Sequence, residues 1–272
     1  MATMDWSAQA LGVPASYAEF LVPAMFAPFA ERLVRRAAVE PGWSVLDVAC
    51  GTGAVARAAA RAVGASGSVT GVDLGEAMLA TARAHAAEDG AAQIEYRQSD
   101  AATLPLDDGV FDVALCQQGL QFFPDRQSAL VEMRRVLKAD GRLAIATWKD
   151  LEGSPFSAVA DALARHVGSE AGEMMQSPFA LADGGELARV ISGAGFRDVV
   201  VEVETIECTW ASQADYARRV LAAGPVAPVF AAADEDAQAA VVEEVAARLA
   251  PHATPDGGLR MPMTSNVALA RR

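Results

Sequence analysis

A short apolar run near residue 45 leads into two closely spaced glycines and then into an alanine-rich stretch. Residues 45–53 read Val-Leu-Asp-Val-Ala-Cys-Gly-Thr-Gly, and residues 54–63 have the composition of a helix. Gly51 and Gly53 carry no side chain, so the turn can adopt unusual dihedral angles and a ligand can approach its backbone. Free N–H groups at the start of the following helix would face that ligand. With Ala56 the pattern also fits the G-x-G-x-x-A of a dinucleotide site, so it does not by itself choose between nucleotide ligands.

Three carboxylates follow successive apolar runs and narrow the choice. Asp47 ends the first run four residues before Gly51, where it suits a cationic ammonium group and disfavours a pyrophosphate. Asp73 ends the next run and can accept hydrogen bonds from ribose hydroxyls, which both ligand classes carry. Asp100 follows the third run and can accept an adenine amino group, while the amide of Ala101 can donate to a ring nitrogen.

The elements expected to position these residues alternate between strands and helices. Such repeated β–α units predict a parallel sheet with helices on both faces. Residues 151–182 break the pattern and are expected to form a helical insertion, or lid. The expected strands are 44–48, 68–73, 93–97, 111–116, 142–148, 199–209 and 261–270, and the expected helical stretches are 54–63, 75–88, 125–137, 183–195 (with Asp183 as N-cap) and 212–251, with a turn at 139–141.

Residues 45–148 resemble the class I S-adenosylmethionine-dependent methyltransferases. The resemblance is to the branch of ubiquinone and menaquinone biosynthesis methyltransferases, also called methyltransferase type 11. It implies an α/β fold with a Rossmann-like, seven-stranded, mostly parallel sheet, an antiparallel last strand (261–270, beside 199–209), helices on both faces and a helical lid. The matching stretches are VLDVACGTG, GVDLGEAML, SDAATLPLDDGVFDVALCQQGLQFF and EMRRVLKADGRLAIATW.

The resemblance also implies a domain organisation. Residues 1–272 are expected to form a single methyltransferase domain whose core, 30–150, binds the cofactor. Two helical insertions, 151–182 and 212–258, are expected to shape the acceptor pocket, and 183–211 and 259–272 to complete the sheet.

The resemblance assigns S-adenosyl-L-methionine as cofactor and S-adenosyl-L-homocysteine as its product. The two glycines would pack against the methionine part, Asp47 would orient its amino group, and Asp73 would hold the ribose. Leu74 and Met78 would contact the adenine, and the backbone carbonyl of Gln117 would accept from the amino group. The full set of expected cofactor-binding residues is Asp47, Ala49, Gly51, Gly53, Asp73, Leu74, Met78, Asp100, Ala101 and Gln117.

The sequence offers no clear general base. Related enzymes often have a histidine near position 121, where this chain reads Gly-Leu-Gln-Phe-Phe. His85 and His252 are expected to be structural or solvent-facing, which leaves His166, within the insertion, as a weak catalytic candidate. The candidate substrate residues are Tyr17, Phe20, Gln121, Phe122, Met175 and Phe179, with Trp148 and Trp210 as weaker additions.

These apolar candidates also have a structural interpretation. The cluster around Tyr17 and Phe20 can pack a helix on the sheet edge, an interpretation slightly favoured over closure above the cofactor. Met175 and Phe179 can be the core of the insertion rather than its pocket. Glu243 and Glu244 are expected to be solvated helix surface.

Composition excludes several classes of partner. The chain has 272 residues, 35 Asp and Glu against 22 Lys and Arg, and a net charge of −13, which disfavours nucleic acid and anionic membranes. Cys50, Cys116 and Cys208 are too far apart for a zinc motif, so no metal is expected. With no signal peptide or membrane span expected, a reducing, cytoplasmic location fits best. A monomer or a homodimer remains open.

The favoured function is methyl transfer to a small, apolar or aromatic metabolite, mainly by positioning, with oxygen, nitrogen or carbon as the accepting atom. One alternative is a methyltransferase-fold protein that acts as a cyclase or cofactor-binding module. A less favoured alternative is an NAD(P)-dependent oxidoreductase. Such an enzyme is expected to have a Tyr-x-x-x-Lys pair, which this chain lacks. Its only lysines are Lys138 and Lys149, and neither has a tyrosine four residues before it.

Overall fold

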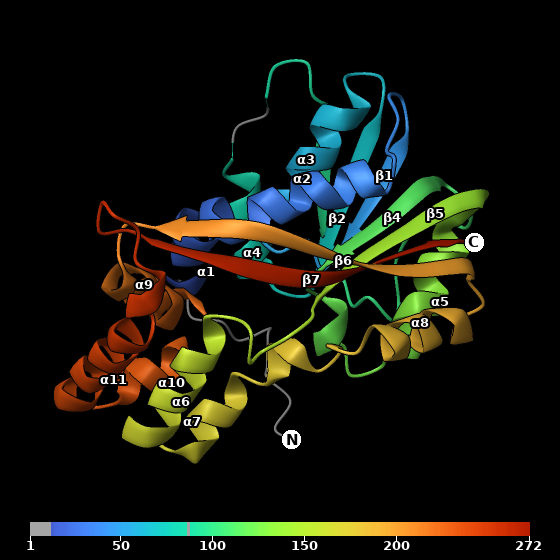
Figure 1. Ribbon diagram of the computed structural model, residues 1–272. Coiled ribbons are helices and arrows are strands. Elements are labelled where there is room, and N and C mark those ends of the chain that lie inside the picture. Colours follow the sequence, from blue (N-terminus) through green and yellow to red (C-terminus); the bar gives the residue numbers. More distant parts are fainter. Residues whose placement is uncertain (1–11, 86–87) are drawn as a thin grey trace.

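The computed structural model describes residues 12–85 and 88–272, which fold around one seven-stranded sheet (Figure 1). The strand order is β3-β2-β1-β4-β5-β7-β6. All neighbouring strands are parallel except β7, which is antiparallel to both β5 and β6. The expected fold class is confirmed. The strands are β1 (Ser44–Val48), β2 (Ser68–Asp73), β3 (Ile94–Gln98), β4 (Phe111–Gln117), β5 (Leu137–Trp148), β6 (Arg197–Trp210) and β7 (Leu259–Arg271).

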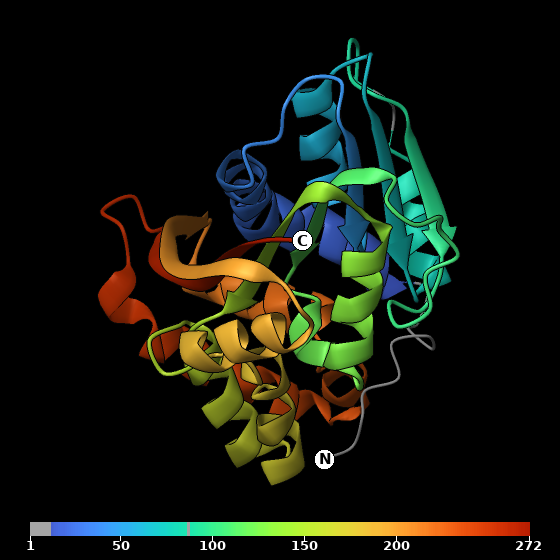
Figure 2. The same cartoon turned by 90° about the vertical axis from the view of Figure 1, so that its right-hand side faces the viewer.

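Helices cover both faces of the sheet because the strands are apolar on both sides. Helices α2 (Ala27–Arg36) and α3 (Ala54–Val63) lie on one face, and α5 (Arg126–Val136) and α8 (Gly184–Gly193) on the other (Figures 1 and 2). Val45, Val113 and Leu115 pack toward α2 and α3, whereas their neighbours in the strands pack toward α5 and α8. Helix α4 (Glu76–Arg83) packs beside β2 and β3.

A third cluster of helices forms a lid where the parallel strands end (Figure 1). The segment before the sheet joins it: α1 (Gly12–Ser16) continues into η2 (Tyr17–Phe26), ten residues of π-helix that contain Pro23. The buried residues of η2 pack with the lid helices and with the ends of β5, β6 and β7. The other lid elements are α6 (Phe156–His166), α7 (Ser169–Met174), η4 (Ser177–Phe179), α9 (Gln213–Ala223), α10 (Ala227–Ala232), α11 (Glu235–Arg248) and η5 (Ala250–His252).

Several boundaries differ from those that the sequence predicts. Helix α4 ends at Arg83, short of the predicted 88. The turn predicted at 139–141 lies within β5 instead. There, Phe111 pairs with Leu137 while Val113 pairs with Arg142, so the extra residues of β5 bulge out of the ladder. The helix start predicted at Asp183 is confirmed, because its side chain accepts a hydrogen bond from the Glu186 amide at 2.9 Å.

The described residues contain neither a membrane-spanning helix nor a metal-binding cluster of side chains. Across 12–85 and 88–272, no helix has both the length and the apolar character needed to cross a membrane. The same residues contain no group of three or more His, Cys, Asp or Glu side chains placed to hold a metal ion.

Gly119 follows β4 and touches the turn after β1, so we expect Gly119→Ala to destabilise the fold. A Cβ at this position would lie 2.6 Å from Cβ of Ala49 and 3.0 Å from Sγ of Cys116. Overpacking of this kind costs about 1–3 kcal/mol. Gly193→Ala is the control, because its Cβ would meet only Oε1 of Gln127 at an ordinary 3.5 Å. Urea unfolding of both variants measures the difference, and equal stabilities would contradict the packing argument.

Candidate functional site

The turn between β1 and α3 contains two glycines that are required for different reasons. Both have positive φ angles, +53° at Gly51 and +83° at Gly53. A Cβ on Gly53 would collide with the Tyr96 hydroxyl and lie 3.1 Å from Nη1 of Arg57. A Cβ on Gly51 would meet no atom of the described residues within 4 Å. Gly53 is therefore needed for packing, whereas Gly51 leaves open space beside the turn that a ligand can fill.

Asp73, at the end of β2, holds this turn in place. Its carboxylate accepts hydrogen bonds from the Gly51 amide at 2.7 Å and the Gly75 amide at 2.8 Å. Burial raises the pKa of Asp73, and the amides of Gly75, Gly51 and Leu74 oppose that rise. The sequence assigns Asp73 only to a ribose, but the structure shows that it also joins the ends of β1 and β2.

Asp47, at the end of β1, is a buried carboxylate without a partner. Asp47 is only 1% exposed, and neither of its carboxylate oxygens has a hydrogen-bond partner among the described residues. Burial is the main cause that raises the pKa of Asp47 well above its ordinary range, and the charge of Asp73 adds to this rise. The Ala56 amide and the charge of Arg57 oppose the rise without cancelling it. Because an unpaired buried charge is costly, this site is suited to a cationic group of a ligand.

Of the residues expected to contact an adenine, Leu74 follows β2, Asp100 and Ala101 follow β3, and Met78 lies in α4. The sheet places the ends of β2 and β3 side by side. Asp73 pairs with Gln98 at the end of the ladder, and the Gln98 side chain donates to the Leu74 carbonyl at 2.9 Å. The Leu74 side chain is 46% exposed, so its apolar surface is available to a ligand. Asp100 is exposed, and its Oδ1 accepts from the Ala102 amide at 2.9 Å.

Three glutamines, the last residue of β4 and two that follow it, make hydrogen bonds to other segments or to each other. Gln117 donates to the Phe26 carbonyl at 3.0 Å, and Gln118 donates to Oγ of Ser265, on β7, at 2.8 Å. Gln121 donates to Oε1 of Gln118 at 3.2 Å. The Oε1 atoms of Gln117 and Gln121 have no partner in the described chain and can accept hydrogen bonds from a ligand. Gln118 and Ser265 were not predicted as site residues. The two consecutive glutamines after the strand predicted at 111–116 could have indicated Gln118.

A row of aromatic rings leads from the carboxylates into the lid. Burial raises the pKa of Tyr17 above its ordinary value, and the negative charge of Asp73 adds to the rise. The expected substrate residues Tyr17 and Phe179 thus stand at opposite ends of one row, with Trp148 between them. Successive ring centroids are 4.8 Å apart for Tyr17–Phe26, 5.9 Å for Phe26–Trp148, 6.2 Å for Trp148–Phe156 and 6.0 Å for Phe156–Phe179.

The remaining candidates lie in the lid or beside the three glutamines. The Phe20 ring packs against the Arg219 guanidinium of α9, 4.2 Å from the ring centroid. Met175 is fully buried in the lid core, and Phe122 is half-buried in the short helix η3 (Leu120–Phe122).

His166 pairs with Glu244 across two lid helices. Its Nε2 lies 2.8 Å from Oε2 of Glu244, so it joins α6 to α11. Glu244 also pairs with Arg165 at 3.0 Å and Arg248 at 3.5 Å, and its side chain is only 14% exposed. The expectation that Glu244 is solvated helix surface is therefore wrong, because cations from two helices surround it.

The arrangement described above, a glycine turn followed by carboxylates on successive strands, fits a known family. Residues 27–206 match the model of the ubiE/COQ5 methyltransferase family. The chain belongs to this family. The resemblance seen in the sequence is thereby confirmed, and with it the cofactor class, S-adenosylmethionine.

Relatives of known activity match part of the chain. Nocamycin O-methyltransferase of Saccharothrix syringae is 38% identical over 120 residues, which cover 44% of this chain and 43% of that protein. Demethylmenaquinone methyltransferase of Lactococcus lactis is 42% identical over 102 residues, which cover 38% of this chain and 40% of that protein. The match thus spans less than half the length of these relatives.

Solved structures share the fold over most of the chain. A crystal structure described as a putative methyltransferase from Bacillus halodurans has a TM-score of 0.58 at 22% identity and covers 89% of this chain and 97% of that one. The [4+2]-cyclase SpnF has a TM-score of 0.57 at 20% identity, covering 90% of this chain and 80% of that one. At this level of identity both show the fold alone.

We expect the two glycines of the turn to respond differently to substitution. Gly51→Ala places a methyl group in the open space, so it should weaken S-adenosylhomocysteine binding at least about tenfold while the left-handed backbone costs stability by about 1–2 kcal/mol. Gly53→Ala adds the collision with Tyr96, so it should lower the melting temperature more than Gly51→Ala does. Calorimetric titration and thermal unfolding measure both effects. A Gly51→Ala protein with wild-type affinity would show that the open space is not the ligand site.

The unpaired carboxylate of Asp47 predicts a pH dependence of stability. Its folded-state pKa lies above its unfolded value, so the folded chain holds the proton over a range in which the unfolded chain has released it. The resulting stabilisation is full below the unfolded pKa and is lost as pH rises through the folded pKa. Asp47→Asn should therefore raise the melting temperature of the ligand-free protein at pH 7 and flatten its decline as pH rises above the ordinary pKa of an aspartate, about 4. An unchanged or lower melting temperature with the wild-type pH slope would mean that Asp47 has a structural partner.

Proposed function

We propose that this chain transfers a methyl group from S-adenosylmethionine to a small, apolar or aromatic metabolite. The observation that carries the proposal is the unpaired carboxylate of Asp47 beside Asp73. S-Adenosylmethionine has an ammonium, a sulfonium and one carboxylate, so its net charge is positive and its two cationic centres are attracted by these carboxylates. A nicotinamide dinucleotide would instead bring its pyrophosphate to the same turn, where the carboxylates repel it.

The residues around the turn fit the parts of this cofactor. Asp47 and the unpaired Oε1 of Gln117 would take the ammonium, and the open space at Gly51 would receive the methionine chain. Asp73 would accept from the ribose while it keeps its bonds to the turn, because each carboxylate oxygen has a second acceptor position. Ala49, Leu74, Met78, Asp100 and Ala101 complete the proposed cofactor site.

The chain's own contribution to the reaction would be alignment and exclusion of water. When bound, S-adenosylmethionine supplies a methyl group that is already activated by its positive sulfur. The aromatic row from Tyr17 to Phe179 and the lid helices would hold an apolar acceptor next to the turn and shield it from water. Holding two reactants in line can contribute about 7–11 kcal/mol in favourable cases. Nε2 of His166 is bonded to Glu244 and joins α6 to α11, and alignment of the reactants needs no proton transfer from it.

The acceptor is proposed from the chemistry of the lid. The buried cluster of the lid is apolar and includes aromatic rings and methionines, which favours an apolar ring compound over a charged polar one. The net charge of −13 also disfavours nucleic acid. Two relatives, named for O-methylation of nocamycin and for methylation of demethylmenaquinone, act on such compounds by name. Whether oxygen, nitrogen or carbon accepts the methyl group is decided by experiment.

Calorimetric titration with S-adenosylmethionine, S-adenosylhomocysteine, NADH and NADPH tests the cofactor assignment. We expect the two sulfur nucleotides to bind and the two dinucleotides not to bind. Asp47→Asn should weaken S-adenosylmethionine binding by at least about tenfold, since a buried charge pair is lost. The matched control is Asp112→Asn, because Asp112 bonds Lys138 and the Ser44 amide at the opposite end of the strands.

Each outcome of that titration has a consequence. Binding of neither sulfur nucleotide by folded protein would overturn the methyltransferase proposal. Tight binding with no methyl transfer to a panel of phenols, hydroquinones, amines and carboxylic acids would favour the alternative of a cyclase or cofactor-binding module.

A further inference from the structure

Two polar atoms are buried without partners deep in the lid, away from the glycine turn. They are Nε1 of Trp210, at the end of β6, and the hydroxyl oxygen of Tyr216, on α9. Tyr216 is fully buried and Trp210 is 7% exposed. The two rings meet edge to face, with centroids 4.8 Å apart. The two hydrogen-bond donors therefore belong to side chains that are in contact.

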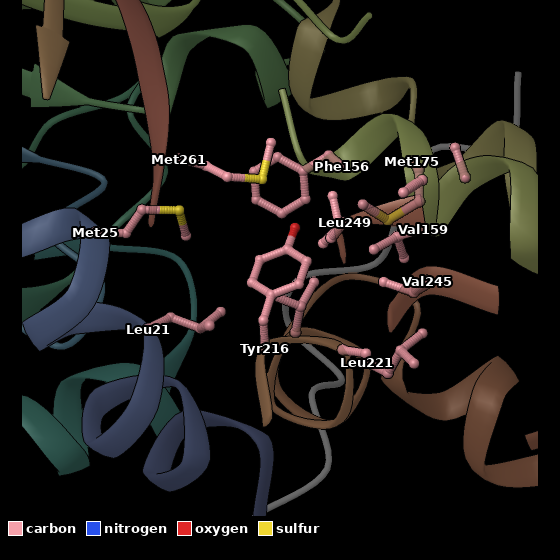
Figure 3. Close-up of a cluster of buried hydrophobic side chains, with 14 of the residues drawn as sticks. Leu21, Met25, Phe156, Val159, Met175, Tyr216, Leu221, Val245, Leu249 and Met261 are labelled. Atoms are coloured by element: carbon pink, nitrogen blue, oxygen red, sulfur yellow. The ribbon is translucent and has the colours of Figure 1, made fainter. Parts of the chain in front are cut away.

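The surroundings of the Tyr216 hydroxyl are apolar. Figure 3 shows it pointing into a cluster that includes Met25 from η2, Phe156 from α6 and Met261 from β7. Leaving a buried donor unpaired destabilises the folded state, so a core that only packed would favour phenylalanine at this position. Burial raises the pKa of Tyr216 well above its ordinary value, and the Cys208 thiol adds to the rise. The phenol thus keeps its proton and can donate.

The walls of this cluster can rearrange around a guest. Met25, Met175, Met261 and Met263 are all buried in it, and methionine side chains adapt readily to new shapes. One wall is η2, whose π-helical backbone is a form found frequently at functional sites.

The same wall connects the cluster to the proposed cofactor site. Tyr17, whose pKa is raised by burial and by the charge of Asp73, and Phe26, whose carbonyl accepts from Gln117, both belong to η2. Helix α9, which carries Tyr216, packs on η2 through the Arg219–Phe20 contact. A molecule held at Tyr216 would therefore lie against the segment that also borders the glycine turn.

We propose that the Tyr216 hydroxyl and the Trp210 N–H donate hydrogen bonds to an oxygen of the methyl acceptor. This inference rests on the proposed function and defines the acceptor class further: an apolar ring compound with a carbonyl, ether or phenolic oxygen. Tyr216 and Trp210 are positioning residues that fix the orientation of the ring, and the packing around them supplies affinity without specificity.

Matched probes that differ by one oxygen test this proposal directly. 1-Tetralone and 1-indanone carry a carbonyl that tetralin and indane lack. Dissociation constants would be measured by ligand-observed NMR with protein saturated with S-adenosylhomocysteine. Wild-type protein should bind each ketone about fivefold more tightly than its hydrocarbon, as expected for hydrogen bonds from neutral donors. Tyr216→Phe should reduce this preference to less than about twofold and leave S-adenosylhomocysteine affinity unchanged.

Two further variants sharpen the test. Trp210→Phe should also reduce the ketone preference, whereas Trp43→Phe should not, because Trp43 stacks on Arg142 at the far end of the strands. Tyr216→Phe should melt at or above the wild-type temperature, since it removes an unpaired buried hydroxyl; a lower melting temperature would reveal a structural partner and overturn the proposal.

The outcomes separate this proposal from the one on which it rests. If wild-type protein shows no preference for the ketones, or if Tyr216→Phe keeps that preference, then Tyr216 does not donate a hydrogen bond to an acceptor oxygen. The proposal that the chain binds the cofactor is not affected by this result. If S-adenosylhomocysteine itself fails to bind, the proposed function falls.

Discussion

Two backbone amides that share one carboxylate hold the carboxyl edge of the sheet together. Asp73 accepts from Gly51, in the turn after β1, and from Gly75, at the start of α4. These bonds set the direction in which the chain leaves both strands and hence where α3 and α4 begin. They also keep the space beside Gly51 open, because they pull the turn toward β2. The negative charge left at Asp73 then acts on Asp47 and Tyr17 and gives the whole edge its electrostatic sign.

The structure concentrates unpaired buried polar atoms where a ligand would satisfy them. Native proteins pair nearly all such groups, so each exception calls for an explanation. Here Asp47, Gln117 and Gln121 lie at the carboxyl ends of β1 and β4, and Trp210 and Tyr216 lie in the adjoining lid. Each lowers the stability of the free chain. A ligand that forms hydrogen bonds with these atoms binds only the folded state, so its binding raises the free energy of unfolding.

Features that depend on neighbouring residues could be predicted from the sequence. The glycine turn, the carboxylates at the strand ends and most strand boundaries follow from short-range patterns, and the family resemblance supplied the antiparallel last strand and its pairing with 199–209. Contacts between distant segments could not be predicted, such as Gln118 with Ser265, 147 residues apart. Periodicity shows that a helix face is buried but does not identify what buries it, which is why Glu244 was misplaced. The division into core and insertions, and the roles of all the expected cofactor-binding, substrate-binding and catalytic residues, stay predictions.

The position of β7 between β5 and β6 has a consequence for how the chain folds during synthesis. Strands β1 to β5 can pair as soon as they leave the ribosome, since each lies beside strands made before it or soon after. Strand β6 has no such neighbour: it bonds only to β7, which is made later, after α9, α10 and α11. Until β7 emerges, β6 and the apolar side of the lid helices remain without their packing partner and open to self-association. The lid can therefore be completed only late in synthesis. Chaperones would bind the exposed apolar surface mainly before β7 has been made.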